Sequence, residues 1–128
     1  MISNNEISIG ILASNKSRRM DFNKANLKIG DKTFLEHIQN VFSKYPEITI
    51  ATNDRNITTD AVYDEHDGVG PMEGIYQILK NTNKKFAFIC SVDMPFIKTE
   101  IVDYLCSKID NEHDCFIYKD DKRGSREF

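Results

Sequence analysis

Basic residues gather in one short polar segment of a chain whose formal net charge is −3. Directly after an apolar run, five of them lie within thirteen positions: Lys16, Arg18, Arg19, Lys24 and Lys28. A concave run of backbone N–H groups binds phosphate, and small residues such as Ser14 and Asn15 let those groups approach an oxyanion. Arginine can add two parallel hydrogen bonds to a phosphate. The segment is a candidate phosphate site, although its charge alone favours a solvated loop.

A second candidate is Asp93, which follows the apolar run at residues 86–92. A carboxylate at the tip of a buried strand can give Mg²⁺ one protein oxygen, while the ion keeps several waters and takes substrate phosphates. Aspartate is also a common turn residue, and Pro95 would fix the chain just beyond it. Both interpretations, a metal ligand and a turn cap, stay open on this segment alone.

The third candidate is an acidic, glycine-containing segment at residues 64–70. Its residues include Asp64, Glu65, His66, Asp67, Gly68 and Gly70. Three carboxylates around a histidine suggest a metal, but adjacent side chains rarely all point at one ion. We favour a loop whose glycines let a flat ligand lie against the backbone while one carboxylate accepts hydrogen bonds from it. The alternative is a solvated acidic loop before a helix N-terminus, where negative charge is favourable.

Alternating strands and helices must position these three segments. Apolar runs predict strands at residues 7–13, 27–29, 48–52, 60–63, 86–91 and 115–118. The 3.6-residue period predicts helices at residues 33–45, from Pro71 onward and at 99–109. This alternation predicts an α/β fold with a mostly parallel sheet between two helical layers. In such sheets ligands bind beyond the carboxyl ends of the strands, where all three segments lie.

The predicted helices carry their own signals. Thr33 and Glu36 form a capping box at the start of the first helix, and His37 falls on its polar face. The helix that begins at Pro71 is expected to bury one apolar stripe, made of Met72, Ile75, Tyr76 and Leu79. Residues 120–128 are polar, and we expect them to fray. His113 lies in a polar turn.

Composition and length exclude several classes of protein. A chain of 128 residues suggests one domain. Its acidic balance argues against nucleic-acid binding, and no apolar run reaches the ~18 residues of a membrane helix. The start of the chain resembles no signal peptide, and its three cysteines form no CxxC pair. We therefore expect a cytoplasmic protein that binds neither nucleic acid nor membrane, without a cysteine zinc site.

Three segments, kept in order and spacing, resemble the molybdenum cofactor guanylyltransferase family of nucleotidyltransferases. The stretch ILASNKSRRM…NKANLKIGDKTFLEHI is similar to the family's LAGG-x-S-x-R-M-G-x-x-K pattern with its following strand, glycine turn and helix. GPMEGIYQIL is similar to the family's GPLAGI, and ICSVDMPFI to its CDxPF segment. The match runs from about Ile9 to Leu105. It implies a Rossmann-like, three-layer α/β/α fold.

The resemblance also implies roles for individual residues. Those implied to bind the nucleotide are Leu12, Ala13, Ser14, Asn15, Lys16, Lys24, Asp64, Gly70 and Asp93. Arg19 and Lys24 fall on basic positions that bind phosphate, and with Asp93 they are the implied catalytic residues. Asp93 is the implied Mg²⁺ ligand. The implied reaction transfers GMP from GTP to molybdopterin and releases pyrophosphate.

Three residues and the length of the chain depart from the family pattern. Ser14 and Asn15 replace two glycines, and Asp21 replaces the glycine that follows Arg-Met. The chain ends soon after the predicted strand at residues 115–118, so we expect the family's C-terminal part to be missing. Two alternatives follow: a related transferase using CTP or another nucleotide, and a non-catalytic nucleotide-binding remnant. The oligomeric state is left open.

Overall fold

A four-stranded parallel sheet forms the centre of the molecule. The computed structural model describes residues 3–13, 28–54, 57, 61–65, 71–110, 112–115, 119–120 and 126–127. The strands are β1 (Ile7–Leu12), β4 (Glu47–Thr52), β5 (Ala61–Tyr63) and β6 (Phe86–Ser91), preceded by a short 3₁₀ helix at Asn4–Glu6. Their order is β5-β4-β1-β6. The predicted parallel sheet is confirmed, since all three pairings are parallel.

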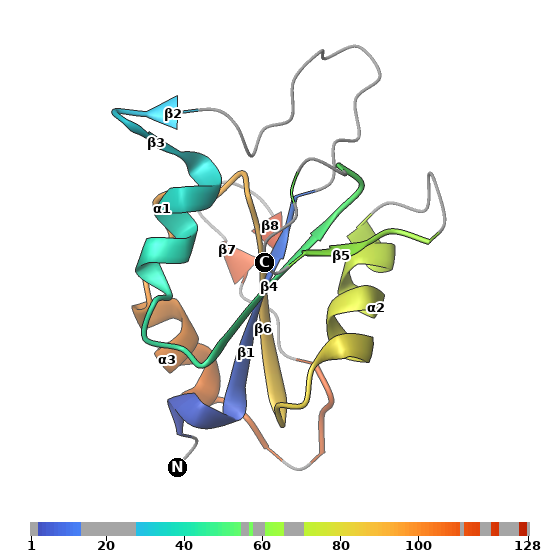
Figure 1. The fold of residues 1–128 in the computed structure, drawn as a ribbon. Coiled ribbons are helices and arrows are strands. Elements are labelled where there is room, and N and C mark those ends of the chain that lie inside the picture. Colours follow the sequence, from blue (N-terminus) through green and yellow to red (C-terminus); the bar gives the residue numbers. More distant parts are fainter. Residues whose placement is uncertain are drawn as a thin grey trace.

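Helices cover both faces of this sheet. Figure 1 shows α1 (Phe34–Val41) and α3 (Glu100–Ser107) on one face and α2 (Pro71–Asn81) on the other. This arrangement confirms the predicted three-layer α/β/α fold. Because the strands are parallel, their carboxyl ends meet at one edge of the sheet. None of the helices in the described parts of the chain is long and apolar enough to cross a membrane.

The face covered by α1 and α3 holds the main apolar core. Ile38 and Phe42 are fully buried, and Val102 of α3 is almost so. The Phe42 ring lies 5.8 Å from that of Phe88 and 5.7 Å from that of Tyr45, measured between centroids. Thr33 and Glu36 form the predicted capping box at the start of α1. The helix is shorter than predicted, because it ends at Val41 and Phe42–Tyr45 continue as turns.

On the other face, α2 packs closely against the sheet at two glycines. A Cβ built on Gly10 of β1 would lie 2.6 Å from Cδ1 of Ile78, and one on Gly74 would lie 2.7 Å from Cδ2 of Leu12. These distances are shorter than van der Waals contact. The helix and strand therefore interlock through two glycines, each opposite a branched side chain.

The predicted apolar stripe of α2 is wrong. Met72, Tyr76 and Leu79 are more than half exposed, and Ile75 is only partly buried. The buried positions of α2 are Glu73, Gly74, Gln77 and Ile78. The helix turns its glycine and its polar residues to the sheet because the strand comes too close for a stripe of large residues and because Glu73 and Gln77 are hydrogen-bonded there.

A small hairpin precedes α1. It consists of β2 (Lys28–Ile29) and β3 (Lys32–Thr33), with Gly30 at a φ of 68° in the turn. This region of backbone favours glycine. His37 is only half-exposed, because its Nε2 lies 2.9 Å from the carbonyl oxygen of Ile29 and so ties α1 to the hairpin. The prediction of a surface histidine on a polar face was therefore wrong in part.

Only the first residue of the predicted C-terminal strand at residues 115–118 is described. Cys115 is exposed and lies outside any strand, and residues 116–118 lie outside the described residues. The pairing found in this part of the chain is between β7 (Lys119–Asp120) and β8 (Arg126–Glu127), which are antiparallel and separate from the central sheet. Polar residues can pair in this way because a two-residue ladder needs backbone groups and no buried face. Asp120, Arg126 and Glu127, which were expected to fray, are therefore paired in this ladder.

Candidate functional site

Backbone hydrogen bonds extend the sheet beyond the carboxyl end of β1. The N–H of Ala13 donates to the carbonyl of Ala51 at 2.8 Å, and the N–H of Val92 donates to the carbonyl of Leu12 at 3.0 Å. The segments that follow β1, β4 and β6 are thereby held side by side. The predicted location at this edge is confirmed for Asp64 and Asp93, while the first candidate segment, which follows Ala13, lies outside the described residues.

Thr52, the last residue of β4, connects the segments that follow β1, β4 and β5. Its buried hydroxyl donates to the carbonyl of Ala13 at 3.2 Å and accepts the N–H of Asp54 at 3.0 Å. Its carbonyl accepts the N–H of Asp64 at 3.2 Å. Sequence reasoning missed this residue. A threonine at the end of a buried strand is the only signal available, and its partners lie up to 39 positions away.

Asp93 follows β6 in a compact turn, with its side chain exposed. The N–H of Asp93 donates to Oγ of Ser91 at 3.2 Å, and the N–H of Met94 donates to the Ser91 carbonyl at 3.1 Å. Ile97, which is 9% exposed, anchors the far side of the turn in the core. Asp93 therefore stands, exposed, in a turn at the predicted edge, and the side-chain acceptor of that turn is Ser91. Its role as a metal ligand stays a prediction.

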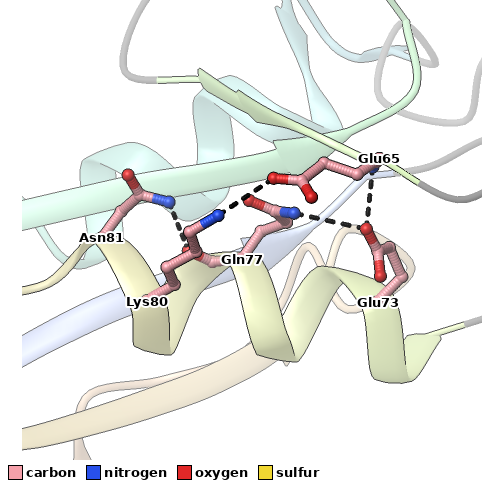
Figure 2. Close-up of polar contacts among 5 residues, drawn as sticks. All are labelled: Glu65, Glu73, Gln77, Lys80 and Asn81. Carbon is pink, nitrogen blue, oxygen red and sulfur yellow. Dashed lines mark hydrogen bonds and ion pairs between the residues drawn. The ribbon is translucent and has the colours of Figure 1, made fainter.

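Glu73 of α2 holds the exit from β5. The N–H of Glu65 donates to Oε1 of Glu73 at 2.7 Å, and Nε2 of Gln77 donates to the same oxygen at 3.2 Å. Figure 2 shows both bonds converging on Glu73, with Asn81 donating to the carbonyl of Gln77 one turn along. The first residues after β5 are therefore fixed to α2.

An exposed ion pair lies beside this network. Nζ of Lys80 is 3.1 Å from Oε1 of Glu65, and both side chains are about half exposed, at 49% and 51%. Hydrogen bonds from Gln77 and Lys80 lower the pKa of Glu65, and the bond to Glu65 raises the pKa of Lys80. Exposed pairs of this kind contribute little to stability, because water screens the two charges.

Four predicted nucleotide-binding residues belong to the described part of the chain. Leu12 is partly buried and packs on α2, Ala13 is fully buried, Asp64 is half-buried and Asp93 is exposed. Ala13 can therefore border a ligand only through its backbone. The other predicted site residues lie outside the described residues: Ser14, Asn15, Lys16, Arg19, Lys24 and Gly70.

Asp93 offers one carboxylate to a cation. Among the residues that the structure describes, no group of three or more histidine, cysteine, aspartate or glutamate side chains could hold a metal ion. A single exposed carboxylate suits Mg²⁺, which keeps waters and takes its remaining ligands from substrate phosphates. Cys90 is a poor ligand, because burial raises the pKa of its thiol to about 12.

Residues 9–126 match the family described as the MobA-like NTP transferase domain. This chain belongs to that family. The predicted family is therefore confirmed, and its segments at Ser14, Gly70 and Asp93 fall within the matched range.

Several curated relatives of this chain are named molybdenum cofactor guanylyltransferases. A probable one from Clostridium perfringens is 33% identical over 121 residues, which cover 91% of this chain and 61% of the relative. Another, from Methanosarcina acetivorans, is 33% identical and covers 81% of this chain and 53% of its own length. The one from Haemophilus influenzae is 33% identical, with 91% and 65% covered. The chain thus spans between half and two-thirds of the length of these relatives.

Solved structures share the fold of this family member. A CMP:2-keto-3-deoxy-manno-octonic acid synthetase complexed with CTP has a TM-score of 0.68 at 18% identity, covering 80% of this chain and 46% of that one. Molybdopterin-guanine dinucleotide biosynthesis protein A from Archaeoglobus fulgidus has a TM-score of 0.59 at 22% identity, with 77% and 53% covered. At these identities the comparison establishes the fold alone.

Proposed function

We propose that this chain carries the nucleotide site of a guanylyltransferase that transfers GMP from GTP to molybdopterin. A phosphate of the acceptor attacks the α-phosphorus of GTP, the bond to the β-phosphate oxygen breaks, and pyrophosphate leaves with that electron pair. Membership of an NTP transferase family and the names of the relatives support this reaction. The observation that carries it is the exposed Asp93 carboxylate at the end of β6, beside the end of β1.

Positioning and charge neutralisation account for most of the catalysis in phosphoryl-type transfer. We assign Asp93 as the residue that would hold Mg²⁺, and Arg19 and Lys24 as the residues that neutralise the leaving pyrophosphate. Mg²⁺, when bound, would offset negative charge on the phosphate oxygens. Ser14, Asn15 and Lys16 would border the nucleotide. These residue assignments rest on the family pattern and on the place of Asp93 at the sheet edge.

Two alternatives come from specific observations. A related transferase that uses CTP or another nucleotide would share this fold, as the synthetase complexed with CTP does. A non-catalytic remnant is motivated by Ser14, Asn15 and Asp21, which stand where the family pattern has glycine. Side chains at these positions bring bulk, and in one case negative charge, to the segment proposed to meet phosphate.

Thermal unfolding with GTP, CTP and ATP, each with Mg²⁺, tests nucleotide binding and separates the nucleotides. A ligand that binds only the folded state stabilises it by about 2.7 kcal/mol at a hundred times its Kd. We expect GTP to raise the Tm most. A larger shift with CTP supports the first alternative, and no shift with any nucleotide contradicts the proposal.

Pyrophosphate release with GTP and molybdopterin tests catalysis. Asp93→Asn removes the proposed metal ligand from an exposed turn, so the fold is expected to survive while the rate falls about 10²–10³-fold. Asp114→Asn, at an exposed position after α3, is the matched control and should leave the rate unchanged. Nucleotide binding without pyrophosphate release by the wild type supports the remnant. A wild-type rate in Asp93→Asn removes Asp93 from the mechanism.

A further inference from the structure

Two successive backbone N–H groups at the exit from β5 are held by two different elements. Asp64 donates to the carbonyl of Thr52 in β4 at 3.2 Å. Glu65 donates to the carboxylate of Glu73 in α2 at 2.7 Å. A chain held on both sides in this way has little freedom to shift relative to the sheet. The exit from β5 is therefore a fixed part of the edge where the other strands end.

Glu73 is an unusual residue for this position. It is only 6% exposed, although a buried carboxylate costs free energy unless hydrogen bonds compensate it. Two donors meet its Oε1, the N–H of Glu65 and Nε2 of Gln77, as Figure 2 shows. Its place in the first turn of α2 also favours negative charge. The helix position next to it is Gly74, which packs on Leu12 of β1.

The order of the strands places this exit on one side of the candidate site. In the order β5-β4-β1-β6, the exits of β1 and β6 carry Ala13 and Asp93, and β4 separates them from β5. If the phosphates lie over β1 and β6, as the proposed function requires, a nucleoside on the other side of β1 lies over β4 and β5. The segment that Glu73 fixes is thus on the nucleoside side of the site, away from the phosphates.

We propose that Glu73 is a positioning residue of the nucleotide site, which acts through the backbone of Asp64 and Glu65 on the nucleoside part of the bound triphosphate. It touches neither the phosphates nor the reacting atoms. This inference rests on the proposed function, because it needs a nucleoside triphosphate at the carboxyl edge. It predicts that loss of the Glu73 acceptor weakens binding of a nucleotide more than binding of the phosphate chain alone.

Calorimetric titration with two probes tests this role: GTP with Mg²⁺, and inorganic tripolyphosphate with Mg²⁺. In Glu73→Ala, the Glu65 N–H loses a buried acceptor, so we expect GTP affinity to fall about tenfold. Tripolyphosphate affinity should stay within about twofold of wild type. Glu73→Gln keeps an oxygen at the position of Oε1 and should restore GTP binding. A general loss of structure would weaken both probes and would not be rescued in this way.

Two further variants make the test specific. Glu65→Pro removes the same hydrogen bond from the donor side, at an exposed position, and serves if Glu73→Ala fails to fold. It also removes the ion pair with Lys80, so Lys80→Ala is its matched control and should bind both probes like wild type. We expect Glu65→Pro to lose GTP affinity and to keep tripolyphosphate affinity.

The possible results separate this inference from the proposed function. If wild type binds neither probe, the proposed function fails and the inference fails with it. If wild type binds GTP but the Glu73→Ala and Glu65→Pro variants that fold bind it equally well, only the inference is overturned. If these variants lose affinity for GTP and for tripolyphosphate to the same extent, the inference is overturned too. Selective loss of GTP binding, rescued by Glu73→Gln, supports it.

Discussion

The helices on the two faces of the sheet bury different kinds of side chain. On one face, Ile38 of α1, Phe42 just after it and Val102 of α3 are buried with the isoleucines of β1. On the other, α2 buries Glu73, Gln77, Gly74 and Ile78 while its apolar stripe faces outward. The first face has the composition of an ordinary core. The second combines close backbone packing with hydrogen bonds that reach the candidate site.

This difference suggests that the two faces contribute differently to the fold. Burial of apolar area supplies most of the free energy of folding, so the face of α1 and α3 should dominate stability. The interlocked glycines of the α2 face contribute less area but set the distance between helix and strand. Substitutions on the two faces should therefore differ in size and in kind.

The largest effect is expected from Phe42→Ala on the apolar face. Phe42 is fully buried and packs on the Phe88 and Tyr45 rings. Its truncation leaves a cavity and should lower the free energy of unfolding by about 3–5 kcal/mol. Urea unfolding followed by circular dichroism measures the change. A loss below about 1 kcal/mol would remove the basis for calling this face the main core.

An intermediate effect is expected from Gly10→Ala on the α2 face. The added methyl meets three atoms of Ile78, the nearest at 2.6 Å, and overpacking of this size costs about 1–3 kcal/mol. Ile78→Val removes that nearest atom, so the double variant should recover part of the loss. The same unfolding experiment gives the coupling between the two changes. If the free-energy changes of the two substitutions simply add, Gly10 is not required for close contact with Ile78.

The smallest effect is expected from Leu79→Gln on the outward stripe of α2. Leu79 is 55% exposed, and surface substitutions usually change the free energy of unfolding by less than about 0.5 kcal/mol. Ile78→Ala, one residue earlier and fully buried, should cost about 2–5 kcal/mol and is the contrast. A larger loss of stability in Leu79→Gln than in Ile78→Ala would mean that the apolar stripe predicted from periodicity is the buried face after all.

The two helices also show what sequence patterns can predict. In α1, the capping box and the 3.6-residue period agree, and both are local signals, so the start and the type of this element could be predicted from the sequence. In α2 the period of Met72, Tyr76 and Leu79 was real, but it marks the wrong face. Burial of Glu73 depends on the N–H of Glu65, a tertiary contact that no local pattern contains.

The same limit applies to the candidate site. Asp64 and Asp93 could be placed at the sheet edge from the rule that parallel strands end there together. Thr52 and Glu73 could not, because their role depends on hydrogen bonds to Ala13 and Glu65 rather than on residue type or spacing. The strand predicted at residues 115–118 stays a prediction, because only Cys115 of that range is described and it lies outside any strand.

Backbone amide NMR during a titration with GTP and Mg²⁺ tests the central claim most directly, that the carboxyl edge of the sheet is the nucleotide site. The account predicts shifts at the amides of Ala13, Glu65 and Asp93, with residues at the opposite ends of the strands, such as Ile7 and Phe86, unchanged. Shifts confined to those opposite ends, or none at saturating GTP, would contradict it.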